Sequence, residues 1–151
     1  MRKASRKQRV RPTSELVKQA LFNILGDISG CVFLDLFAGT GQVGRMAEER
    51  GAEVIYVEKD GRMCDVIKGK SGGKVVRMDA LKFLEGLEAL VDVIFADPPY
   101  GYESYLRLIE LCLRRLKKGG IFVLEHSSKL DFGADDKRIY GDTALSFWRK
   151  D

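Results

Sequence analysis

Short apolar runs alternate with helical stretches along most of this chain. Five runs have the length and composition of buried strands, and four stretches between them have apolar residues at helical spacing. The strand-like runs are 31–36, 53–57, 74–78, 91–96 and 121–125, and the helical stretches lie near 42–50, 61–68, 80–87 and 102–116. Alternation of this kind favours an α/β fold in which helices cover both faces of a parallel sheet.

The two ends of the chain add further elements to this pattern. Residues 14–25 are predicted to form an amphipathic helix with Thr13 or Ser14 as its N-cap. Its apolar face comprises Leu16, Val17, Ala20, Leu21, Ile24 and Leu25. Near the other end, the strand-like runs 137–140 and 143–149 are joined by Gly141-Asp142, which predicts a β-hairpin. The hairpin would add an antiparallel strand to the sheet.

Length and composition favour a single compact domain without a membrane segment. The chain has 151 residues, 45% of them hydrophobic and 32% charged, as in globular proteins. It has neither a membrane-spanning run nor a signal peptide, so we expect a cytoplasmic protein, and we take it to be a monomer. Cys31, Cys64 and Cys112 are scattered, which favours reduced thiols. With His126 as the one histidine, we expect no metal site.

Positive charge is concentrated at the N-terminus. The net charge of +4 comes from 26 basic and 22 acidic side chains, and six of the basic ones fall in the first eleven residues. The remainder has 20 basic side chains and a net charge of −2. We expect residues 1–10 to form a flexible tail on a domain over 11–151, and the tail to contact RNA phosphates, although short basic ends also serve solubility. The expected contacts are Arg2, Lys3, Arg6, Lys7, Arg9 and Arg11.

The segment Asp97-Pro98-Pro99-Tyr100 lies where the strand 91–96 is expected to open into a loop. In open α/β sheets, ligands bind beyond the carboxyl ends of the strands. The Asp97 carboxylate and a prolyl carbonyl, such as that of Pro98, can accept hydrogen bonds from the exocyclic amine of a nucleobase, and consecutive prolines fix those acceptors. Tyr100 offers a flat face on which a base can stack. The simpler alternative is a proline-rich turn with a half-buried tyrosine.

A second segment, 35–41, leads from the first strand into a helix. Gly39 and Gly41 allow a tight turn and a close approach to a ligand. Together with Gly44 they match the G-x-G-x-x-G pattern of dinucleotide sites, and Glu58 lies at the spacing of a ribose-binding acid, so NAD is a candidate cofactor. However, a carboxylate ends each of the first four strands, and four carboxylates around one crevice would repel a pyrophosphate. They suit S-adenosylmethionine, which is cationic and has no phosphate.

Each of these carboxylates has an expected partner on S-adenosylmethionine. We expect Asp35 near the methionine amino group and Glu58 on the ribose hydroxyls. Asp79 would face the adenine amine, and Asp97 would lie beside the methyl group. For any single acid, above all Asp79, a helix N-cap is the simpler interpretation. The set of four is more specific than any member.

Several segments carry a family resemblance: Arg11-Pro12-Thr13, Leu21-Phe22-Asn23, Asp35 to Gly41, Glu58-Lys59-Asp60, Asp79-Ala80, Asp97 to Tyr100 and Tyr140-Gly141-Asp142-Thr143. In these segments the chain resembles the bacterial 16S ribosomal RNA guanine-N2 methyltransferases of the class I, Rossmann-like methyltransferase fold. The resemblance implies a seven-stranded sheet with an antiparallel last strand, S-adenosylmethionine as cofactor, and methylation of a guanine N2 amine in small-subunit RNA. It adds Phe37 and Ala80 to the expected cofactor-binding residues, and Thr13 to the RNA-binding ones.

Two features depart from that family. Its members usually begin with a β-hairpin, whereas ten residues precede Arg11 here, so RNA docking is expected to rest on the basic tail. Residues 127–136 also look too short for a full helix between the fifth and sixth strands.

In the expected reaction, Asp97 orients the amine and stabilises its developing charge, and no strong base is needed. The target base would be unpaired or flipped. His126, beside the same end of the sheet, could act as a general base, but a structural hydrogen-bonding role is the simpler interpretation. The alternatives are DNA adenine-N6 methylation, protein-glutamine methylation, an NAD-dependent oxidoreductase, and a non-catalytic RNA-binding module of the same fold.

Overall fold

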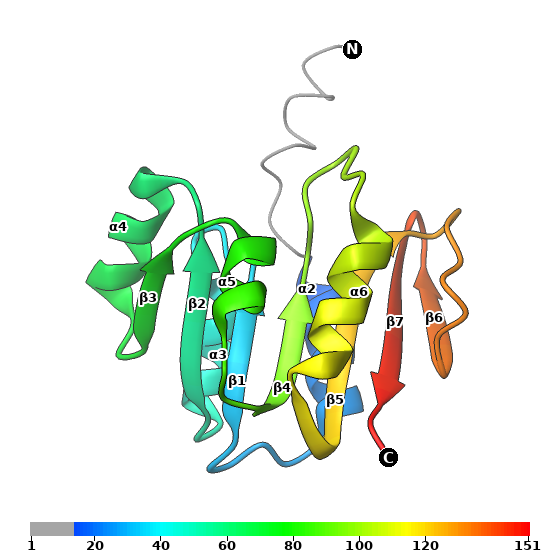
Figure 1. The fold of residues 1–151 in the computed structure, drawn as a ribbon, viewed down its shortest axis with the longest axis horizontal. Coiled ribbons are helices and arrows are strands. Elements are labelled where there is room, and N and C mark those ends of the chain that lie inside the picture. The colour runs from blue at the N-terminus through cyan, green and yellow to red at the C-terminus, as the bar shows by residue number, and fades with distance from the viewer. Residues whose placement is uncertain (1–13) are drawn as a thin grey trace.

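The computed structural model describes residues 14–151, which form a seven-stranded sheet between two layers of helices (Figure 1). The strand order is β3-β2-β1-β4-β5-β7-β6. The strands are β1 (Val32–Leu36), β2 (Glu53–Glu58), β3 (Lys74–Arg77), β4 (Val91–Ala96), β5 (Leu116–Ser127), β6 (Asp136–Tyr140) and β7 (Thr143–Arg149). Each strand-like run of the sequence therefore forms a strand.

The directions of the strands also agree with the prediction. Neighbouring pairs among β1 to β5 are parallel, whereas β7 is antiparallel to both β5 and β6. The predicted hairpin pairs Tyr140 with Thr143 across the turn, where Gly141 has a φ of 65°. Glycine reaches this left-handed conformation without steric cost. The fold is the predicted Rossmann-like arrangement with an antiparallel last strand.

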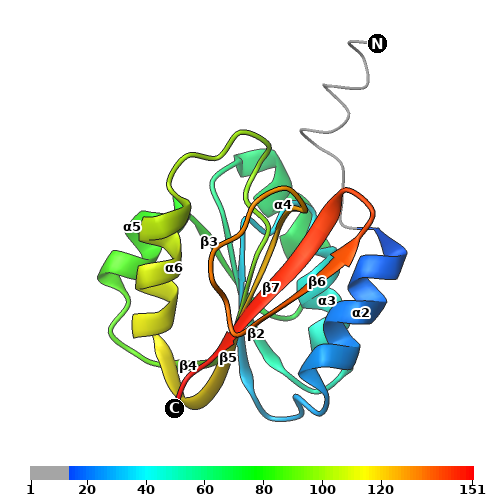
Figure 2. The ribbon, with the colours of Figure 1, turned by 90° about the vertical axis from the view of Figure 1, so that its right-hand side faces the viewer.

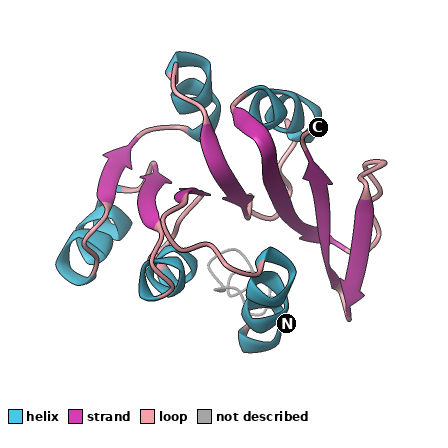
Figure 3. Ribbon diagram, turned by 90° about the horizontal axis from the view of Figure 1, so that it is seen from below, coloured by secondary structure: helices cyan, strands magenta, loops and turns pink. Residues whose placement is uncertain are grey.

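Within residues 14–151, five helices cover the two faces of the sheet (Figures 2 and 3). On one face lie α2 (Glu15–Leu25), α3 (Gln42–Glu49) and α4 (Gly61–Lys70), and on the other lie α5 (Ala80–Gly86) and α6 (Tyr105–Arg114). Each layer packs an apolar helix stripe on inward-facing strand residues, which gives two cores. Leu21 and Phe33 belong to the first core, and Leu108 and Phe122 to the second.

Helix α2 begins at the predicted N-cap, because Ser14 Oγ accepts a hydrogen bond from Val17 N at 3.2 Å. Its apolar face is rotated relative to the prediction. Leu16 is 66% exposed, whereas Lys18 is buried, at 6% exposure. The hydrophobic pattern alone could not distinguish these positions, because a lysine in an amphipathic helix is ordinarily solvated.

Two element boundaries differ from the prediction by three residues or more. Helix α6 begins at Tyr105 and not at 102, because residues 101–104 continue the loop and Tyr102 N donates to the Pro99 carbonyl at 3.1 Å. Strand β5 begins at Leu116 and not at 121, because Leu116 pairs with Val91 before the register shifts. Residues 128–135, between β5 and β6, form neither helix nor strand, as their short length suggested.

The three cysteines are free; Cys64 and Cys112 are buried and Cys31 is partly buried. Within residues 14–151, no helix is long and apolar enough to cross a membrane. The same residues contain no group of three or more His, Cys, Asp or Glu side chains placed to hold a metal ion.

Candidate active site

A cavity of about 460 Å³ lies at the carboxyl ends of β1 to β4, which point upward in Figure 1. Nine of the predicted site residues line it: Asp35, Phe37, Gly39, Glu58, Asp79, Ala80, Asp97, Pro98 and Tyr100. They lie at the ends of four strands or in the segments that follow these strands. The sheet topology therefore gathers into one cavity the carboxylates that the sequence places at successive strand ends.

The turn after β1 lines this cavity with residues 37–40. Phe37, Gly39 and Gly41 all have positive φ values, of 57°, 60° and 83°. Phe37 is the one non-glycine residue among 14–151 in this conformation, which is costly for a side chain with a Cβ, and such residues cluster at functional sites. Gly41 is not among the residues that line the cavity; it is the N-cap of α3.

Asp35 lies within β1 and is almost fully buried, at 1% exposure. Its Oδ2 accepts a hydrogen bond from Gly44 N in α3 at 3.0 Å. Burial raises the pKa of this carboxyl well above its usual range, and the charge of Glu58 adds to the effect, while the Gly44 bond opposes it. Because burial disfavours the ionised form of Asp35, a cation that enters the cavity would stabilise the carboxylate strongly.

Gly44 brings α3 close to the sheet. A Cβ at this position would overlap the ring of Tyr56, which is fully buried on β2. The Tyr56 hydroxyl donates to Glu48 Oε2 at 2.5 Å and so ties the end of α3 to the same strand. The third glycine of the G-x-G-x-x-G pattern therefore serves helix–strand packing.

Glu58 ends β2, and two backbone donors hold its carboxylate. Gly39 N donates to Oε1 at 2.8 Å, and Asp60 N donates to Oε2 at 3.0 Å. Because each carboxylate oxygen has two lone pairs, one acceptor site per oxygen is left for a ligand. A pair of adjacent acceptors in fixed orientation suits a ribose diol.

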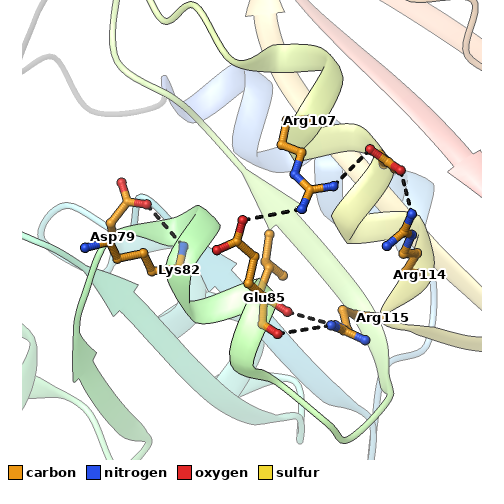
Figure 4. Close-up of polar contacts among 8 residues, drawn as sticks. Asp79, Lys82, Glu85, Arg107, Arg114 and Arg115 are labelled. Carbon is orange, nitrogen blue, oxygen red and sulfur yellow. Dashed lines mark hydrogen bonds and ion pairs between the residues drawn. The ribbon is translucent and has the colours of Figure 1, made fainter.

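The N-cap interpretation of Asp79 is confirmed, and its contact with the adenine amine stays a prediction. Asp79 is the N-cap of α5, with Oδ2 accepting from Lys82 N at 3.2 Å, and it also lines the cavity (Figure 4). The other end of α5 is fixed as well, because Arg115 Nε donates to the Leu84 carbonyl at 2.8 Å. Arg107 of α6 forms an ion pair with Glu85 at 3.4 Å (Figure 4). These contacts fix the position of Asp79.

The segment after β4 also lines the cavity. Asp97 is partly buried, Pro98 is buried, and Tyr100 is 76% exposed. The Pro99 carbonyl already accepts from Tyr102 N, which leaves Pro98 as the better prolyl acceptor for a ligand. The open face of Tyr100 is in keeping with the stacking role predicted for it.

Sequence reasoning did not identify Tyr102 as a lining residue. Its ring contacts Phe37 edge to face at 5.3 Å between centroids and Tyr105 at 5.2 Å. Burial raises its pKa to about 12, with Asp79 the next cause. Met63 and Met78 also line the cavity without having been singled out, as do Lys59 and Asp60, which the sequence analysis named only as part of a family-resemblance segment. They follow β2 or β3 or belong to α4, so only the fold brings them to the site.

His126 has a structural environment. It is 5% exposed, its Nε2 lies 2.7 Å from Ser146 Oγ, and its Nδ1 lies 2.8 Å from the Ser127 carbonyl. Burial lowers its pKa. Because both ring nitrogens are engaged within the protein and the ring does not line the cavity, the structural interpretation is favoured over a general base.

The predicted RNA contacts Arg2, Lys3, Arg6, Lys7, Arg9, Arg11 and Thr13 lie outside the described residues. They remain predictions.

The charged and apolar side chains that line the cavity fit S-adenosylmethionine better than NAD. Five carboxylates line the cavity, against one lysine, Lys59. A pyrophosphate would be repelled there, whereas a sulfonium and an ammonium would be attracted. Apolar side chains from Val57, Met63, Met78 and Ala80 supply the surface that an adenine ring requires.

Three known proteins illustrate what the chain is similar to. YlbH of Bacillus subtilis, named a putative rRNA methyltransferase, is 31% identical over 161 residues, 93% of this chain and 88% of that protein. Ribosomal RNA small subunit methyltransferase D of Haemophilus influenzae is 31% identical over 68% of this chain and 59% of that protein. The structure of the Thermus thermophilus 16S rRNA N2 G1207 methyltransferase, in complex with AdoMet and guanosine, matches with a TM-score of 0.77. It is 24% identical and covers 93% of this chain and 44% of that one, a likeness of fold.

Fold, cavity and relatives together define a class I methyltransferase that uses S-adenosylmethionine. A family model described as Conserved hypothetical protein 95 matches residues 2–149. The chain belongs to this family.

Proposed function

We propose that the protein transfers a methyl group from S-adenosylmethionine to the exocyclic N2 amine of a guanine in small-subunit ribosomal RNA. The observation that carries this proposal is the wall after β4, where the Asp97 carboxylate and Pro98 line the cofactor cavity beside the exposed ring of Tyr100. Acceptors next to an open aromatic face suit a planar base that bears an amine. The relatives named as rRNA methyltransferases support the RNA substrate.

The cofactor would be held by the carboxylates of the first three strand ends. Asp35 would bind its ammonium, Glu58 its ribose diol and Asp79 its adenine amine, with Phe37, Gly39 and Ala80 in contact. When bound, S-adenosylmethionine supplies an electrophilic methyl group. The carboxylate oxygens of this chain then fix where that group lies relative to Asp97.

On the acceptor side, Asp97 and the Pro98 carbonyl would accept the two amine hydrogens, so that the nitrogen lone pair faces the cofactor. The carboxylate also stabilises the positive charge that develops on the nitrogen. Tyr100 would stack on the base, which has to leave its helix to reach the loop. No strong base is required, because the methylated amine is acidic while it is cationic.

The basic residues of 1–11 would supply the long-range attraction to RNA, because the rest of the chain has a net charge of −2. The site as proposed requires no group from a second chain, and we propose that the enzyme acts as a monomer. A ribosomal substrate implies a cytoplasmic enzyme.

The test is methyl transfer from labelled S-adenosylmethionine to three substrates: unmethylated small ribosomal subunits, free 16S rRNA and duplex DNA. We expect label in RNA, recovered after digestion as N2-methylguanosine. The Asp97→Ala protein controls for contaminating activity. Label in DNA as N6-methyladenine would replace the proposal with its main rival, and binding of RNA without transfer would indicate a non-catalytic module.

A further inference from the structure

Lys18 is a buried cation next to the cofactor cavity. Its side chain is 7% exposed, although it belongs to the amphipathic helix α2. Its Nζ donates to Gln42 Oε1 at 2.9 Å and lies 2.8 Å from Glu15 Oε2. Lysine is rarely buried, and a buried ammonium needs partners that offset its desolvation. Gln42 and Glu15 are such partners, but only Gln42 lines the cavity.

The contact fixes the orientation of the Gln42 amide. An ammonium group can only donate hydrogen bonds, so the amide oxygen must face Lys18. The NH2 group of Gln42 is then available in another direction, with two donors. Gln42 is the first residue of α3 and directly follows the turn 39–41, of which Gly39 and Thr40 line the cavity. Lys18 therefore makes Gln42 a donor towards the site.

Five of the groups that line this cavity are carboxylates, which can only accept when ionised. The lining residues with side-chain donors are Thr40, Gln42, Lys59, Tyr100 and Tyr102, and among them Gln42 is the one that a buried cation orients. The methionine part of the cofactor carries both an ammonium and a carboxylate. Asp35 provides an acceptor for the ammonium, but the carboxylate needs a donor and a compensating positive charge. Gln42 and Lys18 are suited to supply these.

We propose that Gln42 and Lys18 together recognise the carboxylate of the methionine part of S-adenosylmethionine. Gln42 Nε2 donates to the carboxylate. Lys18 is a positioning residue, which holds the amide in the donating orientation and adds a cation behind it. The pair thereby distinguishes the complete cofactor from analogues that lack the carboxylate. The inference rests on the cofactor and not on the RNA substrate, so the two can fail separately.

The test compares the affinities of two ligands by calorimetry in the absence of RNA. S-adenosylmethionine carries the carboxylate, and decarboxylated S-adenosylmethionine lacks it but keeps the sulfonium and an amine. Gln42→Glu keeps the length of the side chain and can still pair with Lys18, but it places acceptors where donors are needed. We expect it to weaken binding of S-adenosylmethionine about 10- to 100-fold, the value of a lost charge-assisted hydrogen bond. Binding of the decarboxylated ligand should be unchanged or tighter.

A second variant tests the positioning role. Lys18→Met keeps an apolar stem of similar length, frees the Gln42 amide to turn, and should weaken S-adenosylmethionine binding about 3- to 10-fold, again without loss for the decarboxylated ligand. Glu15→Gln is the matched control: it alters the other, exposed partner of Lys18 and should leave both affinities unchanged. If Lys18→Met does not fold, Gln42→Glu still decides the question. Equal losses for both ligands would overturn the proposal, as would unchanged affinity for S-adenosylmethionine in Gln42→Glu.

Discussion

The two halves of the cavity are built in opposite ways. In the half proposed to bind the cofactor, Asp35 is 1% exposed and bonded to Gly44 N, and Glu58 accepts bonds from two backbone amides. In the acceptor half, Asp97 is partly buried and Tyr100 is 76% exposed on a loop. Backbone amides of the turn after β1, of α3 and of the segment after β2 thus hold the carboxylates of one half, whereas the ring of Tyr100 in the other half is open to solvent.

The difference follows from what each half has to bind. A cofactor of fixed shape is bound best by acceptors that are already oriented, because no ordering cost is paid on binding. A base within a large RNA has to approach from outside and stack, which requires an exposed face. The comparison predicts that changes in the cofactor half alter affinity, and that changes in the acceptor half alter turnover.

The largest effect is expected at Asp97. Asp97→Ala removes the acceptor that orients the amine and stabilises its charge, so turnover should fall roughly 10²- to 10³-fold. The affinity for S-adenosylmethionine should change far less, because the other carboxylates are intact. Single-turnover methylation and calorimetry measure the two quantities separately.

Asp97→Asn is the matched control for this prediction. It keeps a carbonyl acceptor of the same size and loses only the charge, so its turnover should lie between those of the wild type and Asp97→Ala. If a folded Asp97→Ala protein turned over at nearly the normal rate, the division between the two halves would be wrong.

The next effect is expected at Asp35. Asp35→Asn keeps a side-chain oxygen that can accept the Gly44 bond, but it removes the charge proposed to face the cofactor ammonium. The loss of a charge-assisted bond is worth about 1.5 to 3 kcal/mol, which corresponds to about 10- to 100-fold in affinity for S-adenosylmethionine. Saturated turnover should change less than affinity. Calorimetry with the wild-type and Asp35→Asn proteins provides the measurement.

The raised pKa of Asp35 adds a dependence on pH. Because its pKa is higher in the folded protein than in the unfolded chain, Asp35 favours folding at low pH, and this contribution is lost as the pH rises through the folded pKa. Asp35→Asn should therefore gain stability over the wild type as the pH rises.

The cofactor ammonium favours the ionised carboxylate of Asp35, so cofactor binding to the wild type should release protons at pH values below the folded pKa of Asp35. Calorimetry in buffers of different ionisation enthalpy measures the number of protons released on binding. Equal proton release by the wild-type and Asp35→Asn proteins would contradict this expectation.

Most of the fold and the four carboxylates could be predicted from the sequence. Strand and helix patterns are local, and the carboxyl ends of parallel strands must lie on one edge of the sheet. Asp35, Glu58, Asp79 and Asp97 could therefore be expected to meet before any contact was known. The hairpin could be expected because its turn residues lie between two strand-like runs.

The remaining features depend on contacts that no local pattern encodes. Lys18 lies 24 residues from Gln42, and lysine in an amphipathic helix ordinarily faces solvent. Tyr102 continues the helical spacing of α6, but the preceding loop holds it instead. The left-handed conformation of Phe37 has no signal in its residue type, since a phenylalanine disfavours it.

The smallest effect concerns how α3 supports the cofactor half. In Gly44→Ala the added Cβ meets the ring of Tyr56, and overpacking of this kind costs about 1 to 3 kcal/mol of unfolding free energy. Gly69→Ala in α4 is the matched control, because a Cβ there meets nothing within 4 Å. This substitution should stabilise the protein by about 0.5 to 1 kcal/mol, since alanine is the better helix former. Urea unfolding of both variants measures the difference.

Because α3 also carries the Gly44 amide that bonds Asp35, Gly44→Ala should weaken S-adenosylmethionine binding as well, while Gly69→Ala should not. Equal stabilities in the two variants would show that α3 can move away from β2 without cost, and the cofactor half would then be less rigid than its backbone contacts indicate.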